Sequence, residues 1–290
     1  MDAMNSETKR DRLIEIGEAH LPKSAHERWR QLLEPAVYLE HAADGDSTVG
    51  YLGGEAFLPE EMAWPEWEEY GPLTLWATID CAALPRLDLD LDLPESGKLL
   101  FFLADGQLWE SSATPIGYTD GVDHNSHRVV YLPEGTPVSP RPHPARLHCV
   151  AEAEPLTARI ALSGPWMPAH AWFERYGDSD TDVLAVLEGD DFNIDLELWG
   201  NAGTHLGGHH FSLQNDTLEE LVQYGVFEGE DRGEAAVTAE MARWRLLLQF
   251  FPFADTKLWC GDYTHAYWFI TAEDLTARRF DRSILQEQCT

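Results

Sequence analysis

Two short stretches near the start of the chain have the hydrophobic spacing of helices. Between residues 7 and 20, isolated aliphatic residues recur among charged ones, and this spacing predicts a helix that ends before Pro22. Ser24 is followed by Glu27 three positions later, which is the pattern of a capping box. This pattern predicts a second helix, which Pro35 ends.

Most of the remaining chain consists of short apolar or alternating runs that predict β-strands. These runs cover residues 37–39, 72–80, 98–103, 129–132, 146–153, 194–198, 243–250 and 267–270. Proline and glycine separate them at short intervals, as is typical of antiparallel sheets. One more helix is predicted to begin after the cap Asp216 and to end near Gly225. Because strands and helices do not alternate regularly, the pattern favours an α+β fold with a mainly antiparallel sheet.

Three strings from the first part of the chain recur in the same order in the second part. The pairs are residues 51–54 and 205–208 (YLGG and HLGG), 73–80 and 244–250, and 97–102 and 266–270. A spacing of roughly 150 residues predicts two diverged copies that pack across a pseudo-twofold axis. We therefore expect an N-terminal helical segment over residues 1–45, a first β-rich half over 46–150 and a second over 151–290. The two halves are expected to form one integrated domain.

Charge narrows the classes of partner. The chain has 51 acidic and 20 basic residues, a formal net charge of −31, and an aromatic content of 11% that is expected of a folded protein. Such a charge disfavours nucleic acids and anionic membranes, which bind clusters of Lys and Arg. The densest stretch, residues 174–197, holds nine acids and one base, Arg175. The charge supports solubility, and the functional alternative is an acidic face for a basic protein partner.

The sequence gives reasons to expect a cytoplasmic protein. It contains no apolar run of the length of a signal peptide or a membrane span. The four cysteines are far apart and never form a CxxC pair; they are Cys81, Cys149, Cys260 and Cys289. We expect them to be buried or inert thiols in a reducing compartment.

No motif in the chain is specific enough to name a reaction. GxSxG, HExxH, GxGxxG and the P-loop pattern are all missing. The acidic runs at residues 88–92 and 178–182 lack the Gly and Glu that an EF-hand loop requires. The Gly-Gly pairs at 53–54 and 207–208 are interpreted as turns or bulges with positive φ. We therefore predict no catalytic residue, no metal and no cofactor.

The repeated strings resemble those of the bacterial YwqG-like family, a family of unknown function. In the first half the resemblance is carried by Leu52-Gly53-Gly54, Leu58-Pro59, Trp64-Pro65, Pro72-Leu73, Ile79-Asp80, Leu84-Pro85, Gly97 and Phe101-Phe102. In the second half it is carried by Leu206-Gly207-Gly208, Gln214, Leu247-Leu248-Gln249, Trp268-Phe269-Ile270, Asp274-Leu275 and Phe280. The chain departs from the family pattern at Thr78 and Arg279. The resemblance implies a duplicated α+β fold in a cytoplasmic bacterial protein without an assigned activity. Some such relatives are encoded near toxin–immunity systems, which implies an interaction role.

Two functions from different classes follow, and a ligand-sensing fold without catalysis is a third option. The first is a non-enzymatic binding or protein-interaction protein, immunity-like, whose acidic surface meets a basic partner. The alternative is a hydrolase-type enzyme with its active site in the cleft between the two halves, where a ligand is expected to bind. The candidate ligand-binding residues are Trp64, Asp80, His205, His209, Gln214 and Gln249.

Overall fold

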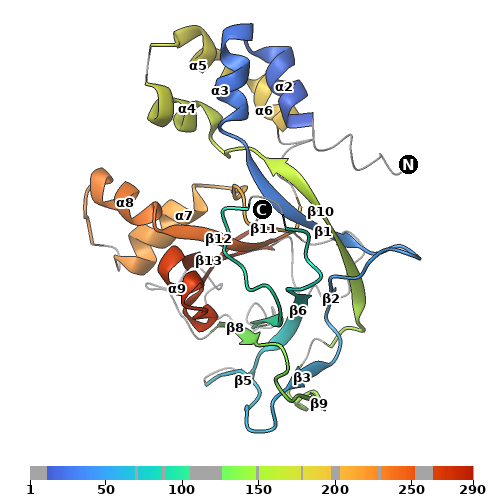
Figure 1. Cartoon of the computed structure of the whole chain (residues 1–290). Helices are drawn as coiled ribbons and strands as arrows, with labels where there is room; N and C mark the ends of the chain where they lie inside the picture. The colour runs from blue at the N-terminus through green and yellow to red at the C-terminus, as the bar shows by residue number, and fades with distance from the viewer. Residues whose placement is uncertain are drawn as a thin grey trace.

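The computed structural model describes residues 12–68, 71–86, 89–104, 126–147, 150–177, 179–196, 203–227, 230–251 and 264–289. It is a mixed α/β structure in which one large sheet carries helices at one end and on one side (Figure 1). The prediction of a mainly antiparallel sheet with short helices is confirmed. Among the helices that the structure describes, none has the length and apolarity to cross a bilayer.

Ten strands form the main sheet in the order β14-β13-β12-β11-β1-β10-β2-β6-β7-β8, and every neighbouring pair is antiparallel. Their bounds are β1 Glu34–His41, β2 Gly50–Leu52, β6 Thr74–Asp80, β7 Lys98–Leu103, β8 His127–Leu132, β10 Glu154–Ser163, β11 His205–Leu206, β12 Trp244–Phe250, β13 Thr264–Thr271 and β14 Ile284–Cys289. Two small ribbons lie beside it: β3 (Ala56–Leu58) with β9 (Ser139–Arg141), and β4 (Glu66–Trp67) with β5 (Gly71–Pro72).

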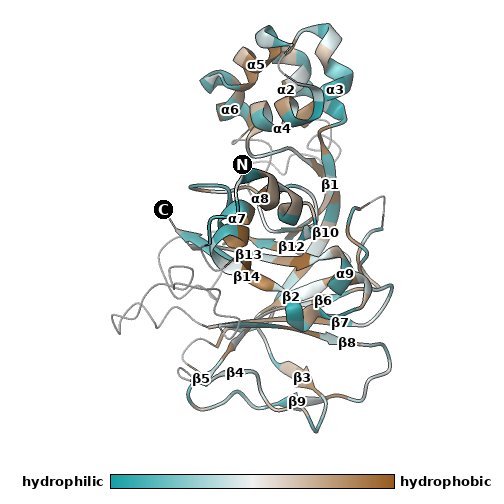
Figure 2. Cartoon of the chain, turned by 90° about the vertical axis from the view of Figure 1, so that its left-hand side faces the viewer, coloured by the Kyte–Doolittle hydropathy of each residue, from teal (hydrophilic) through white to brown (hydrophobic). Residues whose placement is uncertain are grey.

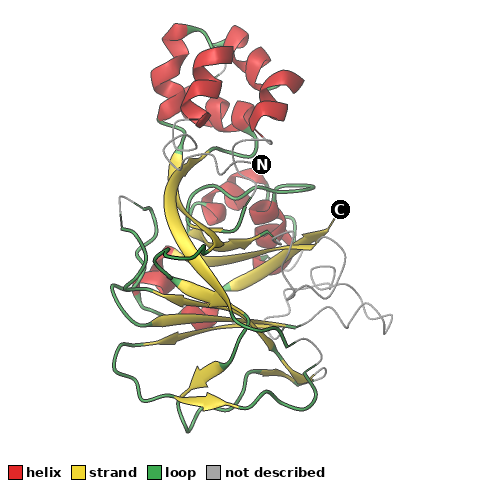
Figure 3. Cartoon of the chain, turned by 90° about the vertical axis from the view of Figure 1, so that its right-hand side faces the viewer, coloured by secondary structure: helices red, strands yellow, loops and turns green. Residues whose placement is uncertain are grey.

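The sheet curls into a near-barrel around a continuous apolar core (Figure 3). Strands from both ends of the sheet contribute to this core, including Phe101 of β7 and Trp268 of β13, whose rings lie 5.5 Å apart. The two outermost strands approach each other where Nε2 of His127 lies 2.9 Å from the backbone oxygen of Ser283. Because β8 and β14 are not paired within the described chain, the barrel stays open at this seam.

A separate helical unit lies at the end of the sheet where β1 begins and β10 ends (Figures 1 and 2). Its elements are α2 (Arg12–His20), η1 (Lys23–Ala25), α3 (His26–Arg30), α4 (Pro168–Tyr176), α5 (Thr181–Leu187) and α6 (Asp190–Leu196). The helices that precede β1 therefore share one core with those that follow β10. Trp29 occupies its centre and donates a hydrogen bond of 2.8 Å from Nε1 to the backbone oxygen of Leu13. Gly17 allows this packing, because a Cβ there would lie 2.0 Å from the Trp29 ring.

The remaining helices flank the second half of the sheet. They are α7 (Thr217–Glu220), the π-helix η4 (Leu221–Val226), α8 (Glu234–Met241), α9 (Ala272–Thr276) and η5 (Phe280–Arg282). The helix predicted after Asp216 is present as α7 and η4, and the carboxylate of Asp216 caps it by accepting hydrogen bonds from the N–H groups of Leu218 and Glu219.

Three local predictions were wrong. Residues 194–196 belong to helix α6 instead of a strand, because Phe192 and Leu196, four positions apart, are the residues that it buries. The strand expected over 146–153 begins at residue 154 instead, as β10. The capping box is not formed, because Ser24 lies inside η1 and the residue that precedes α3 makes no side-chain cap.

Some predicted features lie outside the described residues. These are Cys149, Cys260, residues 197–198 of the expected strand, and one member of each acidic run, Asp88 and Asp178. Cys81 is a buried free thiol.

Candidate functional site

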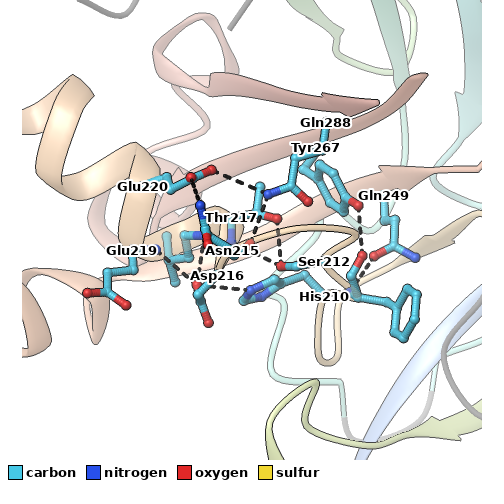
Figure 4. A network of polar contacts seen from close by, with 12 residues as sticks. His210, Ser212, Asn215, Asp216, Thr217, Glu219, Glu220, Gln249, Tyr267 and Gln288 are labelled. Carbon is cyan, nitrogen blue, oxygen red and sulfur yellow. Dashed lines mark hydrogen bonds and ion pairs between the residues drawn. The ribbon is translucent and has the colours of Figure 1, made fainter. Parts of the chain in front are cut away.

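Residues 203–217, which we call the strap, run from β11 to α7 beside the last three strands of the sheet (Figure 4). Gln249 on β12 accepts a hydrogen bond of 2.7 Å from the N–H of Phe211 and donates one of 2.9 Å to the oxygen of Gly203. The hydroxyl of Tyr267 on β13 donates to the oxygen of Phe211 at 2.7 Å. The strap is thus held by side chains from neighbouring strands.

A third strand adds the amide of Gln288 to this arrangement. Gln288 on β14 accepts from the N–H of Leu213 at 2.8 Å and donates to the oxygen of Asn215 at 2.9 Å. The register explains the alignment. Gln249 stands opposite Tyr267, and Gln288 stands opposite His265, which is two residues from Tyr267 and therefore on the same face of the sheet. Gln249 is fully buried and Gln288 is 3% exposed, so both amides replace water as partners of the strap's main chain.

The far end of the strap is fixed to α7. Nε2 of His210 lies 3.3 Å from Oδ1 of Asp216, the residue that caps the helix. Burial alone would raise the pKa of Asp216, but the hydrogen bond to His210 and those from the backbone N–H groups of Glu219 and Leu218 bring the pKa below its ordinary value. The carboxylate is therefore ionised where it supports the first turn of α7.

His205 lies at the start of the strap and is completely buried. Its Nδ1 is 2.9 Å from the backbone oxygen of Gly207, so Nδ1 carries the hydrogen and Nε2 is the unprotonated nitrogen. Nε2 has no hydrogen-bond partner, and the ring packs against Tyr38 with centroids 4.9 Å apart. Burial lowers the pKa of His205 to about 4, so the ring is neutral at physiological pH.

His209 joins the strap to the helical unit. Its Nε2 donates to the backbone oxygen of Leu32 at 2.7 Å, and its own N–H donates to Oγ of Ser163 at 2.9 Å. Glu34 lies 4.0 Å from the same ring nitrogen. Burial lowers the pKa of His209, against the opposing effect of the Glu34 carboxylate.

The structure brings three of the six predicted site residues together, namely His205, His209 and Gln249, and it places an exposed Gln214 on the same strap. Trp64 and Asp80 lie elsewhere. The indole N–H of Trp64 donates to the oxygen of Leu73 at 2.8 Å, and its ring meets Phe102 edge-on. The carboxylate of Asp80 accepts from the N–H of Ala82 at 2.9 Å and supports the turn after β6.

Most polar atoms at the strap serve its own main chain. No group of three His, Cys, Asp or Glu side chains is arranged to hold a metal ion in the described ranges. The unpartnered Nε2 of His205 is the exception among the predicted residues, and it is an acceptor without a proton to give. The sequence does not single out Tyr267, which lies in a continuous apolar run, or Gln288, which lies in a stretch without a strand pattern.

Glu287 on β14 is a second feature that the sequence did not single out. The register aligns it with Ala266 and Phe250, which face the apolar interior of the near-barrel. Burial raises the pKa of Glu287 to about 8, so its carboxyl group is mostly protonated at neutral pH.

Cavities also lie away from the strap, among the residues that the structure describes. One, of about 470 Å³, lies between residues 84–93 and the start of α9, where the Arg245 guanidinium forms an ion pair of 2.9 Å with Asp90. Another, of about 430 Å³, follows the edge of β8.

Residues 51–289 match a protein-family model described as "Domain of unknown function (DUF1963)". The matched stretch contains the main sheet apart from β1 and the first residue of β2, and it leaves out α2 and α3. No curated protein matches the chain.

Proposed function

This chain belongs to the DUF1963 family, a family of unknown function, and we propose that it is a non-enzymatic binding protein that recognises a basic protein partner. One observation carries the proposal. Four exposed carboxylates on and between α5 and α6 have no cationic partner among the described residues; they are Asp182, Glu188, Asp190 and Asp191. Basic side chains of a partner would neutralise these charges.

The contrast with the rest of the helical unit supports this proposal. There, Arg28 pairs with Asp180, and Arg30 pairs with Glu18. These two arginines are therefore already paired within the unit, and α5 and α6 keep an excess of negative charge. Such an excess raises the rate at which an oppositely charged protein associates and favours it over acidic competitors.

An apolar side chain lies beside the free carboxylates. Ile194 is 52% exposed and stands one helical turn after Asp190 on α6. Protein interfaces combine an apolar centre with a charged rim, and this arrangement fits that composition.

The finer parts of the proposal rest on the sequence. The resemblance to YwqG-like proteins supports a bacterial origin and an immunity-like role, in which the basic partner is a toxin. The buried free thiol of Cys81 agrees with a reducing compartment, and we place the protein in the cytoplasm.

We also propose that the sheet arose by duplication. Outward from the central pair, the order is β10-β2-β6-β7-β8 on one side and β1-β11-β12-β13-β14 on the other. The repeated Gly-Gly pairs all have positive φ, and register shifts occur near the middle of both β6 and β12. In this proposal, β1 and β10 have exchanged places between the copies, and the boundaries near residues 45 and 150 are retained as predictions.

No observation favours the hydrolase alternative. Asp80 and His205 share no hydrogen bond, and their strands are separated by β2, β10 and β1. Nucleophilic or acid–base catalysis requires such groups within hydrogen-bonding reach of a shared substrate.

The test compares the native chain with two variants of equal net charge by affinity capture and titration. The first changes the four free carboxylates of α5 and α6 to amides. The control changes four exposed acids far from these helices in the chain, Glu55, Glu60, Glu61 and Glu134. We expect a basic protein to bind the native chain and the control, and to bind the first variant about ten-fold more weakly, a loss of ~1.4 kcal/mol. Equal binding by the two variants, or capture of no basic protein, would contradict the proposal.

A further inference from the structure

The cavity of about 470 Å³ lies between the loop that follows β6 and the start of α9. Three leucines of the loop line the cavity and also belong to the core of the near-barrel, namely Leu84, Leu91 and Leu93. On the opposite side, Leu275 of α9 belongs to the same core. Packing within the protein therefore holds both walls in place. A cavity of this size with fixed apolar walls is typical of a small-molecule site.

Arg86 lines this cavity and is held by backbone oxygens instead of a carboxylate. Its Nη1 donates to the oxygen of Leu93 at 3.3 Å, and its Nη2 donates to the oxygens of Cys81, at 2.8 Å, and Pro94. These bonds use three of the five N–H groups of the guanidinium. The Nε–H and one N–H of Nη1 have no partner among the residues that the structure describes. Because Arg86 is exposed, it is open to a ligand in the cavity.

The other charged residues of the cavity already form ion pairs. Arg245 lies 2.9 Å from the carboxylate of Asp90, and Asp92 lies 3.4 Å from Nη2 of Arg278. Within the described part of the chain, Arg86 therefore carries the one positive charge on the lining that no carboxylate neutralises. A guanidinium forms strong, charge-assisted hydrogen bonds with carboxylates. This balance of charge favours an occupant with a single negative charge.

We propose that this cavity binds a small carboxylate with an aliphatic body. The carboxylate accepts hydrogen bonds from the remaining N–H groups of Arg86, and the aliphatic part contacts the leucines of the loop and of α9. A phosphate monoester fits less well, because it brings nearly two negative charges to a single unpaired cation. The cavity is separate from the acidic helices α5 and α6, so either proposal can fail without the other.

Calorimetric titration of the full chain with hexanoate tests the site. Hexanol, hexylammonium and hexyl phosphate are the matched probes, because they keep the aliphatic chain and change only the head group. We expect hexanoate to bind with a stoichiometry of one, and about ten-fold or more tightly than each of the other three. Acetate should bind more weakly than hexanoate, because it lacks the aliphatic part that the leucines contact.

Two pairs of variants locate the binding. Arg86→Gln removes the unpaired charge, and its control is Arg141→Gln, since Arg141 also donates to two backbone oxygens but lies away from the cavity. Thr276→Trp places an indole at the cavity. Its control is Ala277→Trp, because Ala277 is the next residue and is also exposed, but does not line the cavity. The affinity for hexanoate should fall about ten-fold or more in Arg86→Gln and Thr276→Trp and stay unchanged in both controls.

Urea unfolding of each variant shows whether a loss of binding is a loss of folding. If Arg86→Gln does not fold, Thr276→Trp still decides, because it leaves the hydrogen bonds of Arg86 in place. Equal binding of hexanoate and hexanol, equal binding by the members of either pair of variants, or no binding of hexanoate at about 10 mM would each overturn the proposal. Tighter binding of hexylammonium would also overturn it, because Asp90 and Asp92 would then hold a cation.

Discussion

Gln249 and Phe211 are joined by a hydrogen bond of 2.7 Å between the side-chain Oε1 and the backbone N–H. The same amide donates to the oxygen of Gly203, so one buried side chain supplies the hydrogen-bond partners of two main-chain groups that are eight residues apart. Folding removes these groups from water, and the amide replaces the lost partners. Gln249 is therefore assigned first to the structure of the strap and only through it to binding.

Replacement of Gln249 by Leu should destabilise the protein by about 1–3 kcal/mol, because the part-buried N–H of Phe211 and C=O of Gly203 lose their partners together. The matched control is Gln286→Leu on β14, since the Gln286 side chain makes no hydrogen bond within the described chain. Urea unfolding followed by tryptophan fluorescence measures both. Equal losses in the two variants would show that the hydrogen bonds of Gln249 contribute little.

Gly208 should tolerate no side chain. Its φ is +70°, and a Cβ would lie 2.4 Å from Oγ of Ser163 and 2.8 Å from Cβ of Ala36. Ser163 cannot easily move, because its hydroxyl also donates to the oxygen of Glu34. We expect Gly208→Ala to cost about 3 kcal/mol or more, the sum of backbone strain and overpacking.

Gly135→Ala separates the two contributions to that loss. Gly135 has a similar φ of +78°, but nothing lies within 4 Å of the position that its Cβ would take. Only the backbone strain remains there, so we expect a loss of about 1 kcal/mol. Thermal unfolding of the two variants compares them, and equal losses would mean that the close approach to Ser163 is unimportant.

The sequence could indicate the centre of the candidate site, because the residues involved are close in the chain or lie on adjacent strands. His205 and Gln249 belong to repeated strings, and the pairing of β11 with β12 places them directly opposite each other. Tyr267 and Gln288 were missed because their role depends on the order of β12, β13 and β14 in the sheet. Trp64 belongs to a cluster of aromatic residues in the sequence, and the structure packs it against the smaller core instead of at the strap.

Local patterns failed where two periods fit the same short run. Residues 194–198 alternate strictly, yet Phe192 and Leu196 are also four positions apart and lie on one face of α6. Five residues are too few to distinguish the two periods. The helical unit itself could not be foreseen, because its two parts are separated by more than a hundred residues and meet only through contacts such as Tyr176 with the backbone oxygen of Arg28.

Stability should fall as the pH decreases from 6.5 towards 4, because two histidines are buried in neutral form. Burial lowers the pKa of both His205 and His265 to about 4 from the ordinary value of 6.5. The unfolded chain therefore binds protons in this window that the folded chain does not. Each histidine can reduce the free energy of unfolding by up to about 1.4 kcal/mol per pH unit. Urea titrations at a series of pH values measure the slope.

His205→Gln measures how much of the pH dependence of the free energy of unfolding is due to His205. Between pH 6.5 and 4, unfolding of the variant should take up about one proton fewer than unfolding of the native chain, whatever the stability of the variant at neutral pH. His170→Gln is the control, because the His170 side chain is exposed on α4. An unchanged slope in His205→Gln would mean that the ring is protonated in the folded state.

Glu287 should act in the opposite direction. Burial raises its pKa to about 8 from 4.5, so the folded state retains a proton that the unfolded chain releases above pH 4.5. Its contribution to stability is fully present below pH 4.5 and decreases as the pH rises to about 8. Glu287→Gln keeps the shape of the protonated carboxyl group and cannot ionise. The free energy of unfolding of this variant, relative to the native chain, should therefore increase steadily between these pH values and level off above pH 8. A difference that does not change with pH would show that the carboxylate of Glu287 is solvated in the folded protein.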